Sequence, residues 1–166
     1  MIEIGIVGSK NSGKTTLVET LIEKASKDGY NIVTIKHTSH SHTFDTPGKD
    51  SFRHREAGAS ATIAISEKEM ALFTTPNLEQ VNLFLINMLD TFDICLVEGD
   101  KKSIRPKVLL TNNFESIKDK NPSNIIATYG DEPLDLKVKH FSRSDTDKLY
   151  MYLKEIYFSN TEVVND

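Results

Sequence analysis

Apolar and polar positions near the start of this chain follow two different periods. The nearly continuous apolar run at residues 1–7 is typical of a strand buried in a parallel sheet. From Lys14 to about Asp28 the apolar residues recur at helical spacing, and Gly29 is well suited to end that helix. A second short, β-branched strand is predicted at residues 31–35. The chain therefore begins as strand, helix and strand.

The remaining pattern continues this alternation. Five further strands are predicted from short apolar runs, at residues 61–65, 70–74, 92–97, 108–111 and 125–128. Helices are predicted at residues 52–57, from Pro76 to Leu89, and from a cap at Ser144 or Asp145 onward. Strands that alternate with helices indicate a mostly parallel sheet flanked by helices on both faces, which is a three-layer α/β fold.

Composition narrows the class of protein. With 166 residues, 38% hydrophobic and 27% charged, the chain suits one soluble domain, which we expect to span residues 1–158 with a loose tail at 159–166. The net charge of −4 argues against a nucleic-acid partner, and no apolar run is long enough to span a membrane. A single cysteine, Cys95, and the absence of a leader-like start predict a cytoplasmic protein.

The strongest motif is a phosphate-binding loop. Residues 8–15, GSKNSGKT, fit the G-x-x-x-x-G-K-[ST] pattern between a predicted strand and a predicted helix. The glycines allow a tight turn whose amides face an anion, and the helix start adds its dipole. Lys14 would bind the β and γ phosphates, and Thr15 would offer its hydroxyl to Mg²⁺. The predicted phosphate-binding residues are Gly8, Asn11, Ser12, Gly13, Lys14 and Thr15.

A carboxylate is predicted to lie near this loop. Glu98 ends the buried strand that begins at Phe92, and ligands of parallel α/β sheets gather at the carboxyl ends of strands. There Glu98 can hold Mg²⁺ directly or through water, as a Walker B acid does. Gly99 lets the chain turn away close to the phosphates.

A polar segment at residues 36–51 begins at the same predicted edge. Asp45 and Asp50 are candidate second ligands of Mg²⁺. The three histidines of the segment are candidates for phosphate, substrate or transition-metal contacts, although a solvated loop is an equally simple interpretation: His37, His40 and His42. The basic residues that follow could form a second anion patch or a solvated helix face: Arg53, His54 and Arg55.

These motifs together resemble one family. Four segments carry the resemblance: the phosphate loop, residues 36–37, residues 45–59 (DTPGKDSFRHREAGA) and residues 96–99 (LVEG). They occur in the same order as in the molybdopterin-guanine dinucleotide biosynthesis protein B family. The resemblance is strong over residues 1–105 and extends beyond them only in layout. It implies a P-loop NTPase-type fold and a GTP-binding adapter with Mg²⁺ and at most slow GTPase activity.

The resemblance also implies partners and further site residues. They are the nucleotidyltransferase called protein A of the same pathway, which joins GMP to molybdopterin, molybdopterin itself, and a second copy of the chain in a homodimer. Carried over to matching positions, Thr16 joins the phosphate-binding residues, and Asp45 and Glu98 help to place Mg²⁺. The segment at residues 48–58 would face substrate or partner, and with His37 it supplies the candidates Lys49, Asp50, Arg53 and Arg55.

Three points stay open from the sequence. No N-K-x-D stretch reads guanine, and Thr111-Asn-Asn113 is too ambiguous to replace it, so the preference for GTP rests on the resemblance. No catalytic residue is evident, with His37 and Asp50 as candidates for orienting water. The alternative functions are a P-loop small-molecule kinase and a non-catalytic carrier of a transition metal.

Overall fold

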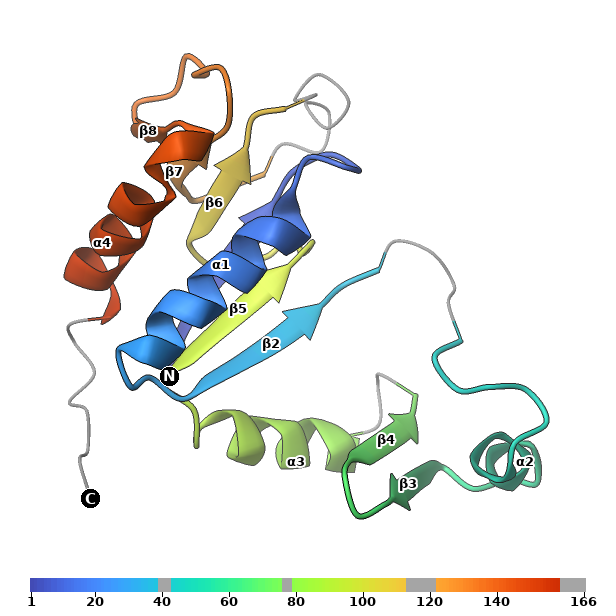
Figure 1. Ribbon diagram of the computed structural model, residues 1–166. Helices are drawn as coiled ribbons and strands as arrows, with labels where there is room; N and C mark the ends of the chain where they lie inside the picture. Colours follow the sequence, from blue (N-terminus) through green and yellow to red (C-terminus); the bar gives the residue numbers. More distant parts are fainter. Residues whose placement is uncertain (39–42, 76–78, 113–121, 159–166) are drawn as a thin grey trace. The chain divides into compact units, whose positions relative to one another are not determined.

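The computed structural model describes residues 1–38, 43–75, 79–112 and 122–158 (Figure 1). The chain divides into two compact units. The first consists of Met1–His37 and the chain from Leu89 onward, and the second of Thr38–Met88. No helix of the described residues is both long and apolar enough to cross a bilayer. The boundary predicted at residue 158 stays a prediction, because residues 159–166 lie outside the described part of the chain.

The first unit is built on a six-stranded sheet in the order β2-β5-β1-β6-β7-β8. Each pair of neighbouring strands is parallel. The strands are β1 (Ile2–Val7), β2 (Ile32–Lys36), β5 (Ile94–Glu98), β6 (Lys107–Leu110), β7 (Ile125–Tyr129) and β8 (Lys139–Phe141). Because the strands are parallel, their carboxyl ends meet at one edge, where β1 leads into the phosphate loop.

Two helices of this unit, α1 (Lys14–Lys27) and α4 (Thr146–Ile156), lie side by side on one face of the sheet (Figure 1). Alternate residues of β1 point to this face, so Ile4 and Ile6 are fully buried against apolar residues of α1 such as Leu21. This packing fixes the start of α1 at the end of β1.

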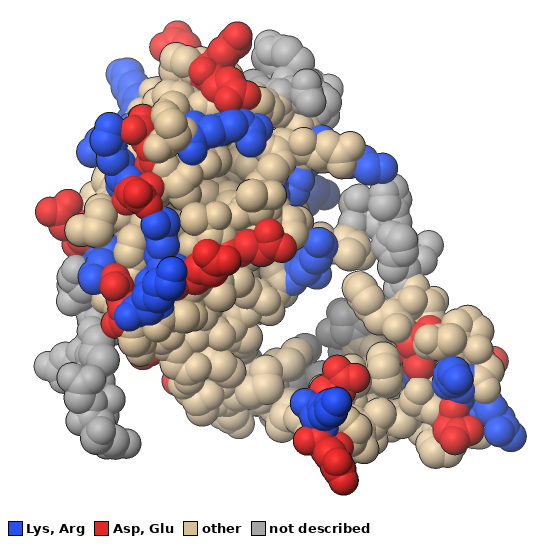
Figure 2. Space-filling model, viewed as in Figure 1, with Lys and Arg blue, Asp and Glu red and all other residues tan. Residues whose placement is uncertain are grey.

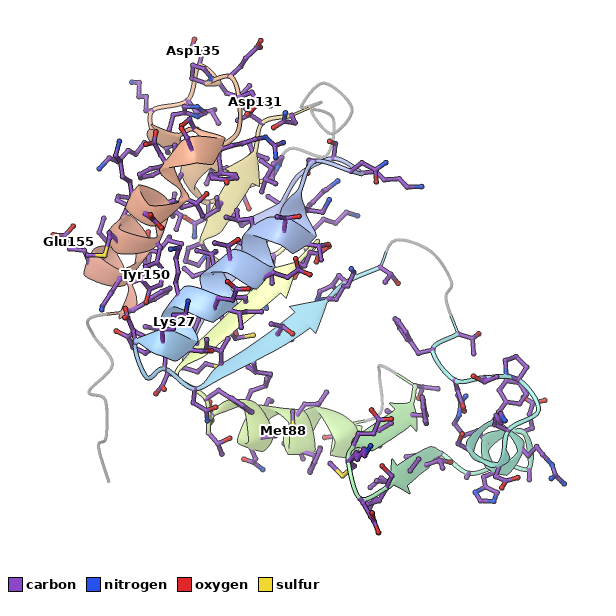
Figure 3. All side chains as sticks on the ribbon, in the orientation of Figure 1. Lys27, Met88, Asp131, Asp135, Tyr150 and Glu155 are labelled. Carbon is purple, nitrogen blue, oxygen red and sulfur yellow. The ribbon has the colours of Figure 1, made fainter. Side chains whose placement is uncertain are left out.

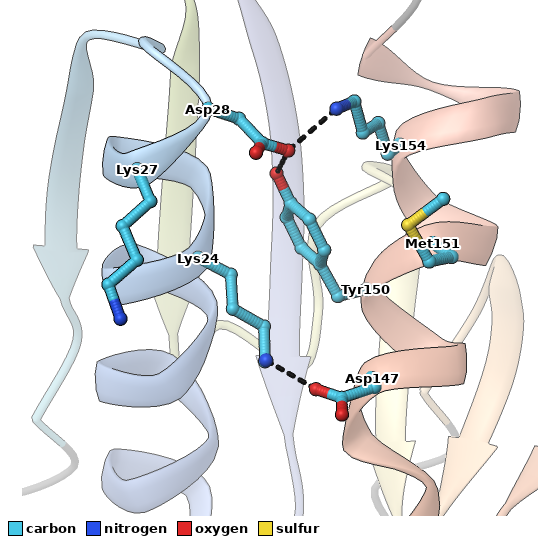
Figure 4. A pocket seen from close by; sticks show the side chains of 7 residues that line it. All are labelled: Lys24, Lys27, Asp28, Asp147, Tyr150, Met151 and Lys154. Carbon is cyan, nitrogen blue, oxygen red and sulfur yellow. Dashed lines mark hydrogen bonds and ion pairs between the residues drawn. The ribbon is translucent and has the colours of Figure 1, made fainter.

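Polar contacts join the two helices at their solvent edge (Figure 4). The Tyr150 hydroxyl and the Lys154 ammonium each donate to Asp28 Oδ2 at 2.6 Å, and Lys24 pairs with Asp147. Acidic and basic residues interleave over the face of the first unit seen in Figure 2, with no extended field of one sign on it.

The second unit contains two helices and a hairpin. They are α2 (Asp50–Glu56), the antiparallel strands β3 (Ala61–Ile65) and β4 (Met70–Thr74), and α3 (Glu79–Leu89). The hairpin turn is held by Ser66, whose amide and hydroxyl donate to the Glu69 carbonyl. Its strands form a separate two-stranded sheet.

The structure confirms the α/β class and the mostly parallel sheet flanked by helices. One strand has no counterpart in the sequence analysis, and one local prediction needs correction. Strand β8 was not predicted, because three residues carry too little periodicity to distinguish a strand. Asp145 does occupy the N-cap position of α4, but its carboxylate makes no capping bond within the described residues; instead it accepts from Ser142 Oγ at 2.7 Å and pairs with Lys148.

Candidate nucleotide-binding site

The phosphate loop connects β1 to α1 through two residues with positive φ. Gly13 has φ 95° and Asn11 has φ 60°, a conformation that glycine adopts freely and asparagine tolerates. Gly13 is the N-cap of α1 and offers no side-chain cap, so the first amides of the helix remain available to an anion. The amides of residues 9–13 make no backbone hydrogen bond to another described residue. These five amides, an open ring of donors, are free within the described residues to meet an anion, and their role in binding phosphate stays a prediction.

The first glycine of the motif is needed for space. A Cβ on Gly8 would lie 2.6 Å from the Ser12 hydroxyl and 2.9 Å from Leu110 Cβ, closer than real Cβ contacts occur. Ser12 is fully buried, and its hydroxyl has no hydrogen-bond partner among the described residues. The loop therefore folds tightly onto the ends of β1 and β6 because position 8 has no side chain.

Lys14 lies over the loop that precedes it. Its ammonium donates to the Ser9 carbonyl at 2.5 Å, while the Ser9 hydroxyl donates to the Asn112 carbonyl at 2.8 Å. Burial lowers the pKa of Lys14, the nearby Glu98 raises it and Lys36 lowers it further. The shifted pKa indicates an ammonium that is partly removed from water and incompletely paired, which is suited to an incoming anion.

Thr15 and Glu98 lie together at the edge of the sheet. Thr15 Oγ1 is 3.3 and 3.4 Å from the two carboxylate oxygens of Glu98, and Lys36 Nζ is 3.6 Å from Oε1. Strand register explains this, because Ile6 of β1 and Lys36 of β2 are both paired with Glu98. Neighbouring ligands of an octahedral Mg²⁺ lie about 3 Å apart, so this hydroxyl and carboxylate fit a shared ion.

The chain after Glu98 brings two further charged residues, Asp100 and Arg105, close to His37. Gly99 has φ 96°, and a Cβ there would lie 2.7 Å from the His37 carbonyl oxygen. Asp100 consequently lies beneath His37, with 4.0 Å between Oδ2 and Nε2, and it pairs with Arg105. Burial raises the pKa of Asp100, but the charges of His37 and Arg105 outweigh this and hold it below its usual value. Sequence reasoning missed Asp100 and Arg105, since neither stands in a motif.

The second unit contains the other candidate residues. Asp45 is almost fully buried and accepts from Ser51 Oγ at 2.8 Å and from Arg55 NH2 at 2.7 Å. The Arg55 guanidinium also faces the rings of Phe52 and Phe73, at 5.8 and 5.7 Å from their centroids. Burial raises the pKa of Asp45, but the bonds from Arg55 and Ser51 outweigh it, so the pKa is lowered.

These contacts give Asp45 and Arg55 a structural role in shaping the segment around α2. The role of Asp45 at Mg²⁺ stays a prediction, as does that of Arg55 toward a substrate. Lys49, Asp50 and Arg53 are exposed or nearly so, with Arg53 NH1 3.7 Å from Asp50 Oδ1. They remain available to a partner.

The histidine loop is only partly described. His40 and His42 lie outside the described residues, and the prediction of a metal site on them stays open. Within the described residues, no group of three or more histidine, cysteine or acidic side chains is arranged to hold a metal ion.

A parallel α/β sheet whose first strand leads through this loop into a helix, with an acid ending the adjacent strand, defines the P-loop NTPase class. The family model described as Molybdopterin guanine dinucleotide synthesis protein B (MobB) matches residues 3–131. The chain belongs to this MobB family.

Curated relatives agree with this assignment. The chain is 36% identical over 151 residues to the molybdopterin-guanine dinucleotide biosynthesis adapter protein of Escherichia coli, covering 87% of this chain and 86% of the relative. It is 36% identical over 127 residues to a probable adapter protein of Bacillus subtilis, covering 75% and 73%.

Solved structures agree as well. The crystal structure of Bacillus subtilis MobB superposes with a TM-score of 0.75 at 28% identity, covering 93% of this chain and 98% of that one. A MobB homolog from Bacillus stearothermophilus superposes with a TM-score of 0.67 at 27% identity, covering 93% and 97%.

Proposed function

We propose that this chain is a GTP-binding adapter in the synthesis of molybdopterin-guanine dinucleotide, with slow Mg²⁺-dependent GTP hydrolysis. The adapter role is supported by the family and by the names of the curated relatives. The choice of GTP follows from the guanine nucleotide that this pathway incorporates. A cytoplasmic location is part of the proposal and agrees with the single free cysteine, Cys95.

The observation that carries nucleotide binding is the open ring of amides at residues 9–13. Ser9 and Ser12 are buried, and buried backbone donors are normally paired, so amides that have no partner among the described residues at a helix start favour an anion. Lys14 adds a charge whose hydrogen bond, within the described part of the chain, goes to a neutral carbonyl, that of Ser9. A polyphosphate in the ring would replace this contact with a charge-assisted one.

Thr15, Thr16 and Glu98 are proposed to hold the Mg²⁺ ion and the phosphates beside it. The hydroxyl and carboxylate are hard oxygen ligands, which Mg²⁺ prefers. When bound, the ion would neutralise charge on the β and γ phosphates. Lys36, 3.6 Å from Glu98, can move to a phosphate as the carboxylate turns to the ion. Hydrolysis is proposed to be slow, as the resemblance to the family implies, with His37 and Asp50 as the candidates for orienting water.

The segment at residues 48–58 is proposed to face the nucleotidyltransferase or molybdopterin. Its exposed side chains carry both signs, with Lys49 and Arg53 beside Asp50. Arginine and lysine suit the phosphate of a pterin ligand, and a mixed pair suits a protein surface. Asp45 keeps this segment folded through Ser51.

A homodimer is proposed through the apolar surface of the second unit. The hairpin and α3 expose a group of large apolar side chains: Ile63, Ile65, Met70, Leu83, Phe84 and Ile86, each at least 49% exposed. Exposed apolar groups of this kind mark interaction surfaces. Changing Ile65 and Met70 to Ser should give a monomer in sedimentation equilibrium, and an unchanged mass for that variant would count against this interface.

A calorimetric titration of the purified protein with GTP and with ATP, each with and without Mg²⁺, tests the nucleotide proposal. GTP is expected to bind more tightly than ATP and more tightly with Mg²⁺ than without. Absence of GTP binding under all conditions would overturn the proposal. Rapid turnover of ATP on adding an acceptor would instead favour a kinase.

A further inference from the structure

We infer that Arg143, which precedes α4, is a positioning residue for the phosphate loop, a role that rests on the proposed nucleotide binding. Arg143 lies 131 residues after Ser12 and belongs to the short 3₁₀ turn η2 (Arg143–Asp145). Its NH2 donates to the Ser12 carbonyl at 3.1 Å. No sequence motif includes it.

Asp131 orients the guanidinium. The Arg143 Nε lies 3.1 Å from Oδ1 and 3.2 Å from Oδ2 of Asp131, at the carboxyl end of β7 (Figure 3). Asn112 Nδ2 also donates to Asp131 Oδ2, at 2.6 Å. The planar guanidinium therefore contacts the carboxylate through one nitrogen and the loop carbonyl through another, a geometry that a lysine ammonium cannot reproduce.

The backbone of Arg143 is also held in place. Its carbonyl accepts from the buried Tyr129 hydroxyl at 3.3 Å and from Thr146 Oγ1 at 3.0 Å. The guanidinium reaches the loop from a fixed base on β7 and α4. Such an anchored side chain loses little freedom when it makes its contact.

The contact with Ser12 sets the direction of an amide in the ring. The Ser12 carbonyl and the Gly13 N–H belong to one trans peptide plane and point in opposite directions. Because the Ser12 carbonyl is held toward Arg143, the Gly13 N–H points to the opposite side of the peptide plane, away from the guanidinium. A charged donor on the carbonyl also polarises the peptide and strengthens its N–H as a donor.

The same contact explains a second demand on Gly13. A Cβ at this position would lie 3.0 Å from Arg143 NH1, in addition to the strain of φ 95°. The second glycine of the motif thus leaves room for the arginine that fixes its own peptide.

The test compares Arg143→Ala and Asp131→Ala with the parent protein, with Lys148→Ala as the matched control. Lys148 follows on α4, is highly exposed and pairs with Asp145 rather than the loop. We expect affinity for Mg²⁺-GTP to fall about tenfold in each of the first two variants and to stay unchanged in the control. The Asp131 variant is the sharper of the two, because removing a carboxylate near an anion site would by electrostatics alone strengthen binding.

Backbone ¹⁵N relaxation of the nucleotide-free proteins provides a readout that does not depend on GTP. Order parameters at residues 12 and 13 should fall in both variants and approach the parent value only partly in Arg143→Lys. Unchanged order parameters, or tighter GTP binding by Asp131→Ala, would overturn the role of Arg143. A parent protein that binds no GTP while the order parameters still fall would overturn the proposed function and leave the contact established.

Discussion

The Thr15 hydroxyl lies 3.3 Å from a carboxylate oxygen of Glu98, although 83 residues separate them in the chain. Parallel pairing of β1 with β5 produces this contact, because both strands end at the same edge of the sheet. It joins the helix start that suits phosphate to a carboxylate that suits a metal ion. The role proposed for Glu98 at Mg²⁺ depends on this contact.

Replacing Lys14 by Ala should abolish most nucleotide affinity without unfolding the protein. Lys14 is the first residue of α1, and its hydrogen bond to the Ser9 carbonyl is local. We expect a loss of about 100-fold in affinity for GTP by calorimetry, since a partly desolvated charge contact to phosphate is removed. Lys10→Ala, which removes an exposed charge from the same loop, should change affinity little. Equal losses in the two variants would mean that only net charge matters.

Glu98→Gln should weaken the Mg²⁺ dependence of hydrolysis while nucleotide binding is kept. The substitution preserves shape and removes the charge that holds the ion. Hydrolysis rates measured over a Mg²⁺ titration should saturate at a higher concentration in the variant than in the parent. Glu23→Gln, an exposed carboxylate on α1, is the control. Identical titration curves for Glu98→Gln and the parent would remove Glu98 from the metal site.

Cys95 should be unreactive in the folded protein. It is fully buried in β5, and burial raises the pKa of its thiol to about 11, with Glu3 contributing in the same direction and Arg105 opposing it. At pH 8 roughly one thiol in a thousand is then ionised. A disulfide reagent should modify Cys95 only after guanidinium chloride is added. Full modification within minutes in the native state would show that β5 opens readily.

Tyr150 should make stability depend on alkaline pH. Burial raises its pKa, and the hydrogen bond to Asp28 raises it further. Because the folded pKa exceeds the unfolded value of about 10, the contribution is complete below pH 10 and is lost as the pH rises toward the folded pKa. Urea midpoints measured from pH 8 to pH 11 should therefore fall less steeply for Tyr150→Phe than for the parent. Parallel slopes for the two proteins would exclude this hydrogen bond as their cause.

The periodicity of the chain was sufficient to determine most elements of the fold. Residues 1–35 predict strand, loop, helix and strand, and the structure confirms each with bounds shifted by a residue or two. Buried parallel strands are continuous apolar runs, and amphipathic helices repeat every 3.6 residues, so local pattern is enough to recognise them. Motif spacing placed the phosphate loop for a similar reason, since all its parts are adjacent in the chain.

Only the tertiary structure decided which distant residues surround that loop. Arg143 and Asp131 carry no local signal. Arg143 reaches Ser12, with Asp131 on its guanidinium, because β7 and α4 fold back onto the sheet that holds β1, with β6 between β1 and β7. Lys107 shows the same limit: a lysine that sequence would place at the surface is fully buried, with its ammonium donating to the carbonyls of Ser103, Arg105 and Ser123. Side-chain periodicity reports burial of apolar groups, whereas a buried charge depends on carbonyls that chain folding brings to it.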